Sequence, residues 1–198
     1  MVMGVLGRPK KFDPDRALDQ ALDVFWRNGY ESTSIADLTA AMGINPPSLY
    51  ATFGNKEQLF RKALDRYIQQ RTEFWNEAQR APTARGMVEH LMRASADFLT
   101  EECNPPGCML VRGAMLSSEA ESAMQKEMTS RRAQGEVWLR QRFEAAKAAG
   151  EVPADFNPDE FARYIMTLLE GMSVRAAGGA TRAELHTVVE MALRAWPV

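Results

Sequence analysis

Several residue types and patterns are scarce in this 198-residue chain, and each absence excludes a class of protein. Two cysteines, Cys103 and Cys108, are too few for a disulfide-stabilised scaffold, so we expect a reduced, cytoplasmic protein. No apolar run approaches the ~20 residues that a helix needs to span a bilayer. The opening MVMGVLGRPKK lacks an apolar core with a cleavage site, so the sequence predicts neither a signal peptide nor a membrane partner.

Histidines and the common catalytic motifs are also scarce. The chain has only His90 and His186, and neither belongs to a Glu-x-x-His pair of the kind that holds iron in helical bundles. There is no phosphate-binding glycine loop and no nucleophile elbow. We therefore expect no catalytic activity, no metal site and no cofactor, and a helical enzyme or carrier is the less favoured alternative.

Strand signals are almost absent, whereas helix signals recur along the whole chain, so we predict an all-α fold. Capping residues mark the starts of the first four helices. A cap followed by proline at the first helical position occurs at Asp13-Pro14 and Asn45-Pro46. Capping boxes occur at 34–37 and 55–58, the second of which opens a long connecting helix. Further helices are expected near 83–102, 105–116, 118–149, 158–177 and 181–196.

The segment around Pro46-Pro47 predicts a helix-turn-helix. Both prolines occupy helical positions whose backbone donors have no intrahelical partner, so they start a short helix after the turn at Gly43. Leu49 and Phe53 are spaced to face inward. The outer face then presents small and polar side chains and the Tyr50 hydroxyl, a combination that suits DNA.

Positive charge is not in excess overall but is concentrated at the amino terminus. The net charge of −2 argues against a protein that coats nucleic acid. Residues 1–62 nevertheless carry eight Lys/Arg against seven Asp/Glu, and Arg8, Lys10 and Lys11 precede the first acidic residue. Such an arm either stays solvated or enters the minor groove beside a recognition helix. We favour the second interpretation.

The last two expected helices each carry a wide apolar stripe. Apolar residues recur at helical spacing over 161–172 and again over 185–196. Two matching stripes exceed what one small bundle needs to cover. We therefore predict that they pair with their copies across a two-fold axis, which gives a homodimer through the last two helices.

Residues 8–62, which include ALDVFWRNGYESTSIADLTAAMGINPPSLYATFGNKEQLF, resemble the DNA-binding domain of the tetracycline-repressor (TetR) family. Farther along, NPPGCMLVRGA is similar to a segment found in one subset of that family. The resemblance implies a transcriptional regulator, usually a homodimeric repressor, that a small molecule releases from a palindromic operator. It also implies a DNA-binding domain over 1–62, and an effector-binding and dimerisation domain over 63–198.

The resemblance further implies which residues contact DNA. The phosphate contacts would come from the cap at Thr33 and Ser34 and from Tyr50 and Lys56, and the arm would add Arg8 and Lys10. The recognition surface would consist of Asn45, Pro46, Pro47, Ser48, Ala51 and Thr52. Many relatives carry a basic residue where this chain has Pro46-Pro47. We therefore expect contacts with thymine methyl groups and DNA shape to replace bidentate guanine recognition.

The effector is expected to be apolar or aromatic, and not a phosphate or a metal ion. The flexible side chain of methionine fills irregular space, so the twelve methionines are consistent with a hydrophobic core and also with a ligand pocket of adjustable shape. The lining expected from aromatic and sulfur content consists of Cys108, Met109, Met115, Trp138 and Tyr164. The long helix that starts at Asn55 would transmit the signal. The alternative is a redox-responsive regulator that acts through Cys103 and Cys108.

Overall fold

The computed structural model describes residues 12–116 and 123–197, and within these ranges every regular element is a helix. None of these helices is long and apolar enough to cross a membrane. In chain order they are α1 (Pro14–Asn28), α2 (Ile35–Met42), α3 (Pro46–Phe53), α4 (Lys56–Gln79), α5 (Ala84–Leu99), α6 (Met109–Leu116), α7 (Ala123–Ala148), α8 (Pro158–Ala177) and α9 (Arg182–Arg194). The prediction of an all-α fold is confirmed.

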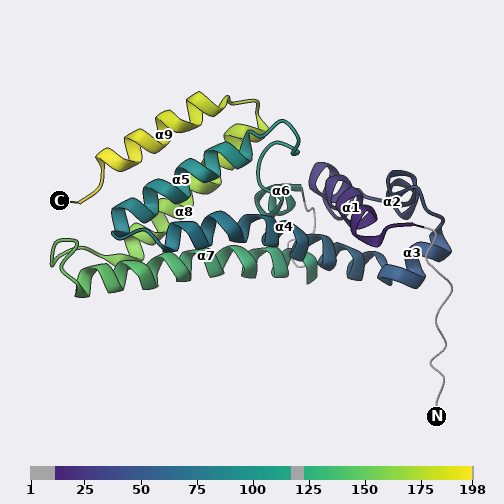
Figure 1. Cartoon of the computed structure of the whole chain (residues 1–198), viewed down its shortest axis with the longest axis horizontal. Coiled ribbons are helices and arrows are strands. Elements are labelled where there is room, and N and C mark those ends of the chain that lie inside the picture. Colours follow the sequence, from purple (N-terminus) through teal and green to yellow (C-terminus); the bar gives the residue numbers. More distant parts are fainter. Residues whose placement is uncertain (1–11, 117–122, 198) are drawn as a thin grey trace, which may run out of the picture.

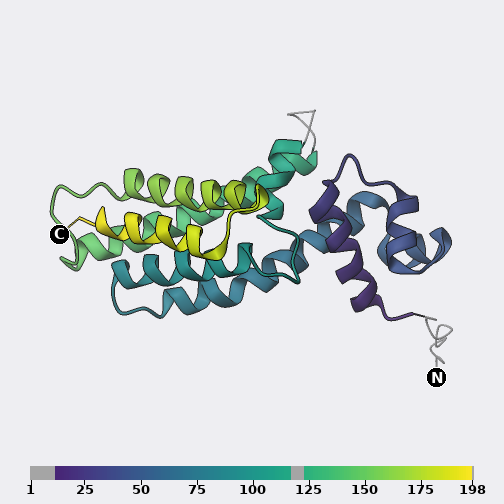
Figure 2. The same cartoon turned by 90° about the horizontal axis from the view of Figure 1, so that it is seen from above.

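The molecule is elongated, with a small head at one end and a larger bundle at the other. Helices α1, α2 and α3 form the head, and α4 runs from it into the bundle beside α7 (Figures 1 and 2). At 1.5 Å per residue, the 24 residues of α4 span about 36 Å. Two ion pairs fix its alignment with α7, at 3.1 Å between Arg61 and Glu127 and at 2.7 Å between Asp65 and Arg131.

The predicted capping residues start the first four helices. Asp13 caps α1 ahead of Pro14, and Asn45 caps α3 ahead of Pro46 and Pro47. Ser34 with Asp37, and Asn55 with Gln58, form the capping boxes of α2 and α4. The turn at Gly43 is left-handed, with φ of +64°, a conformation that glycine adopts without strain. The paired prolines therefore begin α3 instead of breaking a helix.

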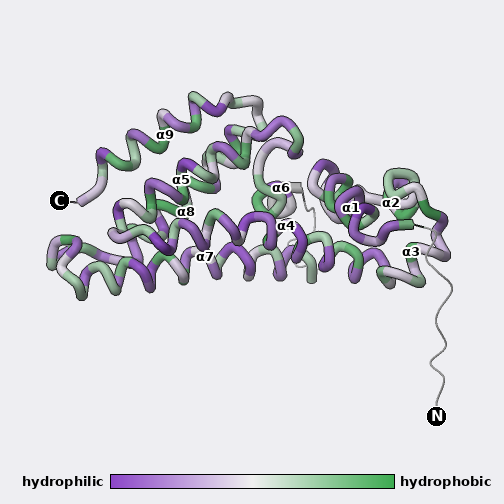
Figure 3. Tube along the Cα trace, in the orientation of Figure 1, coloured by the Kyte–Doolittle hydropathy of each residue, from purple (hydrophilic) through white to green (hydrophobic). Residues whose placement is uncertain are grey.

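One continuous apolar core joins the head to the bundle. Leu38, Leu49 and Phe60 fill the centre of the head, and Met92 and Phe143 are equally buried in the bundle. The hydropathy trace alternates between hydrophobic and hydrophilic segments along α5, α8 and α9, as expected for helices with one apolar side (Figure 3). Because the core is shared, displacements in the bundle can reach the head through packed side chains.

The sixth helix begins later than predicted. We expected a helix from residue 105, but α6 begins at Met109. Gly107 has a φ of +84°, and its carbonyl oxygen accepts a hydrogen bond from the indole of Trp26 at 2.9 Å. The backbone N–H of Cys108 donates to the Ser173 hydroxyl at 2.7 Å. These distant partners hold the segment before α6 in a turn, which a local sequence pattern cannot reveal.

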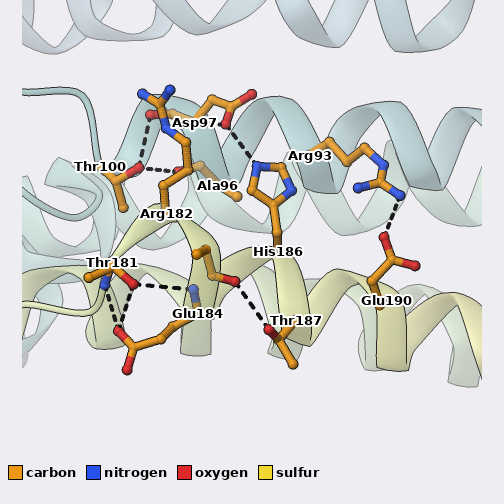
Figure 4. Close-up of polar contacts among 11 residues, drawn as sticks. Arg93, Ala96, Asp97, Thr100, Thr181, Arg182, Glu184, His186, Thr187 and Glu190 are labelled. Atoms are coloured by element: carbon orange, nitrogen blue, oxygen red, sulfur yellow. Dashed lines mark hydrogen bonds and ion pairs between the residues drawn. The ribbon is translucent and has the colours of Figure 1, made fainter.

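Much of the two carboxy-terminal stripes is covered within the chain, which corrects the expectation that the whole stripes face a second copy. Helix α9 packs on α5 and α8, and most stripe residues are buried there, namely Ile165, Leu169, Met172, Leu185, Val189, Ala192, Leu193 and Trp196. Polar contacts fix α9 on α5: Arg93 binds Glu190 at 2.5 Å, and Asp97 meets His186 at 2.9 Å and Arg182 at 3.4 Å (Figure 4).

Candidate DNA interface and effector cavity

The outer face of α3 forms an exposed surface at the tip of the head. Leu49 is fully buried and Phe53 is 6% exposed, so the inward face matches the prediction. Asn45, Pro46, Pro47 and Ala51 are exposed, Ser48 and Thr52 are half-buried, and Tyr50 is 50% exposed. The Oδ1 atom of Asn45 accepts the backbone N–H of Ser48 at 2.9 Å, and the amide Nδ2 of this exposed residue is a hydrogen-bond donor.

The hydroxyl groups of Thr33 and Ser34, the cap predicted to contact phosphate, are both bonded within the protein. Thr33 is 1% exposed, and its hydroxyl donates to the Gly29 carbonyl at 2.6 Å. Ser34 is the cap itself, and its hydroxyl donates to Asp37 at 2.6 Å. The hydrogen bonds from the Ser34 hydroxyl and backbone lower the pKa of Asp37. Thr33 is therefore part of the buried core of the head, and Ser34 supplies the cap of α2.

Lys56 is held in position by the loop between α1 and α2. Its Nζ atom lies 4.4 Å from the ring centroid of Tyr30 and donates to the Glu31 carbonyl at 3.4 Å. Burial lowers the pKa of Lys56, and Glu31 opposes this shift. A cation at the amino end of α4 is thereby fixed beside α3. The predicted contacts Arg8 and Lys10 lie outside the described residues.

The bundle contains two adjoining cavities. The inner cavity offers about 70 Å³ to the centres of water-sized molecules and is lined from all five helices α4 to α8. The outer cavity offers about 290 Å³ and lies between α4, α6 and α7. They share a wall formed by Arg71, Trp75, Leu110, Arg131 and Gly135. Partly open, mostly apolar cavities with a few polar groups are typical of ligand sites.

Only some of the predicted effector residues line the cavities. Cys108 lines the inner cavity and Trp138 lines the outer one, where its ring meets Trp75 edge-on at 5.0 Å. Met109 is buried core and borders neither cavity. Tyr164 is 37% exposed on α8, away from both, because the outward face of that helix carries it. Met115 belongs to α6, and its side chain lies outside the described part of the chain.

The two cysteines do not form a pair. Cys103 is exposed, whereas Cys108 is buried, and both thiols are free. The Cys108 sulfur accepts hydrogen bonds from the Tyr67 hydroxyl at 3.1 Å and from Arg71 at 3.4 Å. Burial, with a further contribution from Cys108, raises the pKa of Tyr67 well above its ordinary value. The tyrosine therefore keeps its proton and donates it. This disposition does not favour the redox alternative.

Sequence reasoning missed the polar residues of the inner cavity. Arg71 and Ser95 line it together with Arg131, Arg132 and Glu170. A signal was present, since Arg71 follows Tyr67 by four residues on the buried side of α4, and Ser95 interrupts the apolar side of α5. A polar residue within a buried helical stripe indicates either a buried partner or a ligand.

Trp26 of the head contacts the wall of the inner cavity. Its indole N–H donates to Gly107 next to Cys108, and its ring stacks on Phe98 at 5.8 Å. It also meets Tyr67 edge-on at 4.8 Å. Phe98 and Cys108 line the cavity, so only one residue separates the cavity from α1. Trp26 therefore connects α1 to the wall of the inner cavity through direct contacts.

Known proteins match both parts of the chain. The family model of bacterial regulatory proteins of the tetR family matches residues 17–63, and that of the tetracyclin repressor-like C-terminal domain matches residues 82–192. The transcriptional repressor ComR of Escherichia coli K12 is 37% identical over 194 residues, which cover 96% of this chain and 92% of ComR. The repressor BdcR of the same organism is 35% identical over 111 residues, 55% of this chain and 56% of BdcR.

A solved structure extends the likeness to the whole fold. The TetR-family regulator CifR, as a triple-cysteine variant bound to a 26-base-pair operator duplex, is 41% identical with a TM-score of 0.91. The match covers 96% of this chain and 100% of that one. These relatives are transcriptional regulators and not enzymes. With a head that exposes a recognition helix and both family models matched, the chain belongs to the TetR family of bacterial transcriptional regulators.

Proposed function

We propose that this regulator is a repressor that binds a palindromic operator as a homodimer and is released when a small molecule fills the inner cavity. The relatives ComR and BdcR are both named as transcriptional repressors, which supports repression instead of activation. The structural observation that carries the proposal is the contact of Trp26 with the cavity wall. It gives a ligand inside the bundle a short path to the DNA-binding head.

A dimer would use the outward side of α8 and α9. Tyr164 and Val174 on α8 are 37% and 43% exposed, and Met191 on α9 is 57% exposed. Half-buried Leu168 and Val188 lie on the same two helices. Large exposed apolar side chains on adjacent helices mark interaction surfaces. A two-fold axis through this surface would pair α8 and α9 with their copies as a four-helix interface.

Two heads in one dimer would read two half-sites. Related helix-turn-helix dimers contact half-sites about 34–36 Å apart, or a multiple of this spacing, which requires a palindromic sequence. The 26-base-pair duplex bound by CifR covers about two and a half helical turns, enough for two such half-sites. A ligand lowers operator affinity if it binds more tightly to a conformation whose two heads do not match the spacing of the half-sites. A ligand with equal affinity for both conformations would not change their equilibrium.

Selection from a pool of random DNA duplexes tests this proposal without knowledge of the regulated genes. We expect the full-length protein to enrich a palindrome, and gel-shift titration of that sequence to show two protomers per duplex. An enriched site without two-fold symmetry, bound by one protomer, would contradict the dimeric mode. Enrichment of no sequence would contradict sequence-specific binding altogether.

Substitutions on α3 should separate affinity from specificity. Tyr50→Phe removes a hydroxyl directed at phosphate, so we expect about a 10-fold loss of affinity on the selected palindrome and on unrelated DNA alike. Ser48→Ala should weaken the palindrome selectively and relax one position of the consensus, at a cost of about 1–3 kcal/mol per affected base pair. Competition gel shifts with both duplexes measure the ratio. A changed consensus in Tyr50→Phe would show that this side chain reads bases.

A further inference from the structure

We propose that the inner cavity binds an organic carboxylate, with the guanidinium of Arg71 as its cation and the hydroxyl of Ser95 as a second donor. This inference rests on the proposed function, because it names the chemical class of the effector. It refines the expectation of an apolar or aromatic molecule by adding one negative charge to it. Three observations carry it: an unpaired cation, orphaned polar atoms and an apolar wall at the same place.

The first observation is the charge state of the lining. Throughout residues 12–116 and 123–197, no carboxylate lies within 4.0 Å of the Arg71 side chain. Its neighbours are the sulfur of Cys108 and the rings of Tyr67 and Phe74, at 5.6 and 5.8 Å from the guanidinium carbon. Burial alone would lower the pKa of Arg71, but Tyr67 and Cys108 outweigh it, so the pKa is raised. The group stays cationic without a counter-ion.

The other charges of the cavity are already matched. Arg131 binds Asp65 at 2.7 Å and Glu127 at 3.0 Å, and Arg132 faces Glu170 at 3.9 Å. Removing a cation from water without a partner is costly, and an anion that enters the cavity would offset this cost. Since only one cation remains without a carboxylate partner, the cavity suits a monoanion better than a phosphate dianion.

The second observation is that buried polar atoms at the cavity lack partners. Ser95 is 3% exposed, lines the inner cavity, and its hydroxyl oxygen has no hydrogen-bond partner among the described residues. The same holds for the Nε atom of Arg132. Buried polar atoms in folded proteins are nearly always paired, so each exception is a position where a bound water or ligand can supply a partner. A hydroxyl and an N–H group are both able to donate to a carboxylate oxygen.

The third observation is the apolar character of the remaining wall. Phe74, Trp75, Phe98, Leu99 and Leu169 line the inner cavity, and Trp75 also borders the outer one. Burial of a hydrocarbon group against these side chains contributes about 25 cal/mol per Å² removed from water. An inorganic ion would leave this wall empty. An aromatic or aliphatic acid fills it, and the outer cavity accommodates the part that extends beyond Trp75.

Matched acids and amides test the charge requirement in the absence of DNA. We would titrate the full-length protein by calorimetry with benzoate, phenylacetate and hexanoate, and with benzamide, phenylacetamide and hexanamide. At least one acid should bind about 10-fold more tightly than its amide. Arg71→Gln should reduce this preference below about threefold, whereas Arg71→Lys should retain part of it. Ser95→Ala should weaken the acid several-fold. Inorganic phosphate should not compete.

Controls keep the outcome decisive. Arg80→Gln changes an exposed arginine at the end of α4 that borders neither cavity, and it should leave the preference intact. Circular dichroism would verify that each variant is folded. Equal affinity for acids and amides, a preference that persists in Arg71→Gln, tight binding of phosphate alone, or no binding up to about 10 mM would each overturn the proposal. None of these results would affect operator selection, so failure of this inference is separable from failure of the proposed function.

Discussion

Charging the exposed apolar surface of α8 and α9 should give monomers that bind the operator at least about 100-fold more weakly. Leu168→Glu combined with Met191→Glu places an acidic side chain on each helix, and a two-fold axis would bring each one near its copy. Like charges in a desolvated interface repel strongly. Affinity falls because two linked heads no longer bind the same duplex together. Linking two binding sites typically raises the overall affinity by about 10²–10⁴-fold without any new DNA contact.

The control for this variant adds the same charge elsewhere. Gln79→Glu with Gln141→Glu introduces two acidic residues on exposed positions of α4 and α7, and it should remain dimeric with normal operator affinity. Sedimentation velocity gives the oligomeric state, and gel-shift titration gives the affinity. Leu193 is not a suitable site, because it is 6% exposed and a charge there would unfold the bundle. A dimeric Leu168→Glu, Met191→Glu variant with intact affinity would place the interface elsewhere.

Gly107→Ala should destabilise the whole protein by about 2–5 kcal/mol. The φ of +84° costs a residue with a β-carbon about 1–2 kcal/mol. The added carbon would also lie 2.8 Å from the carbonyl oxygen of Ser173 and 3.1 Å from the β-carbon of Ala177. Relieving this overlap moves the backbone of α8 or the turn, at a further cost of about 1–3 kcal/mol. We expect Tm to fall by about 4–20 °C.

Gly150→Ala separates the two contributions. Gly150 has a similar φ of +73°, but a β-carbon added there would meet nothing within 4 Å. Its substitution should cost only the backbone strain, about 1–2 kcal/mol, and lower Tm by about 2–8 °C. Thermal unfolding followed by circular dichroism compares the two variants. Equal Tm values for both would mean that the turn before α6 is not tightly packed against α8.

The head was predictable from the sequence because its determinants are local. Asp13, Ser34, Asn45 and Asn55 cap helices within three residues of their own positions, and Gly43 supplies the left-handed turn between α2 and α3. Such contacts depend on short spacings that a sequence displays directly. Thr33 is the exception, since its hydroxyl reaches back to Gly29, and a buried hydroxyl and an exposed one look alike in a sequence.

The bundle was less predictable because distant partners decide its details. The turn before α6 is held by Trp26 and Ser173, which are 81 and 65 residues away from their partners in the chain. The packing of α9 on α5 decides which residues of each carboxy-terminal apolar stripe are buried. The periodicity of the sequence alone does not reveal this packing. The role proposed for Arg71 depends on the folded structure, in which no carboxylate of residues 12–116 and 123–197 lies within 4.0 Å of its side chain. Local spacing predicts helices, whereas cavities arise from how helices meet.

The proposed function depends on the coupling between the cavity and the head through Trp26. Reciprocity requires that if a ligand weakens operator binding by some factor, the operator weakens ligand binding by the same factor. Trp26→Phe removes the hydrogen bond to Gly107 while retaining an aromatic ring. It should leave ligand affinity in free protein within about twofold and reduce the coupling factor severalfold. Trp196→Phe, buried at the far end of the bundle, is the matched control and should retain the coupling.

The most direct measurement is the affinity of the tightest-binding acid for the protein alone and for the protein saturated with its selected operator. Calorimetry on both samples gives the ratio, and gel shifts at saturating acid give the corresponding loss of operator affinity. We predict that the acid binds operator-bound protein more weakly, by about 5–150-fold as is typical of allosteric coupling, and that the two factors agree. Equal affinity of the acid for free and operator-bound protein would contradict the proposed coupling between the cavity and the head.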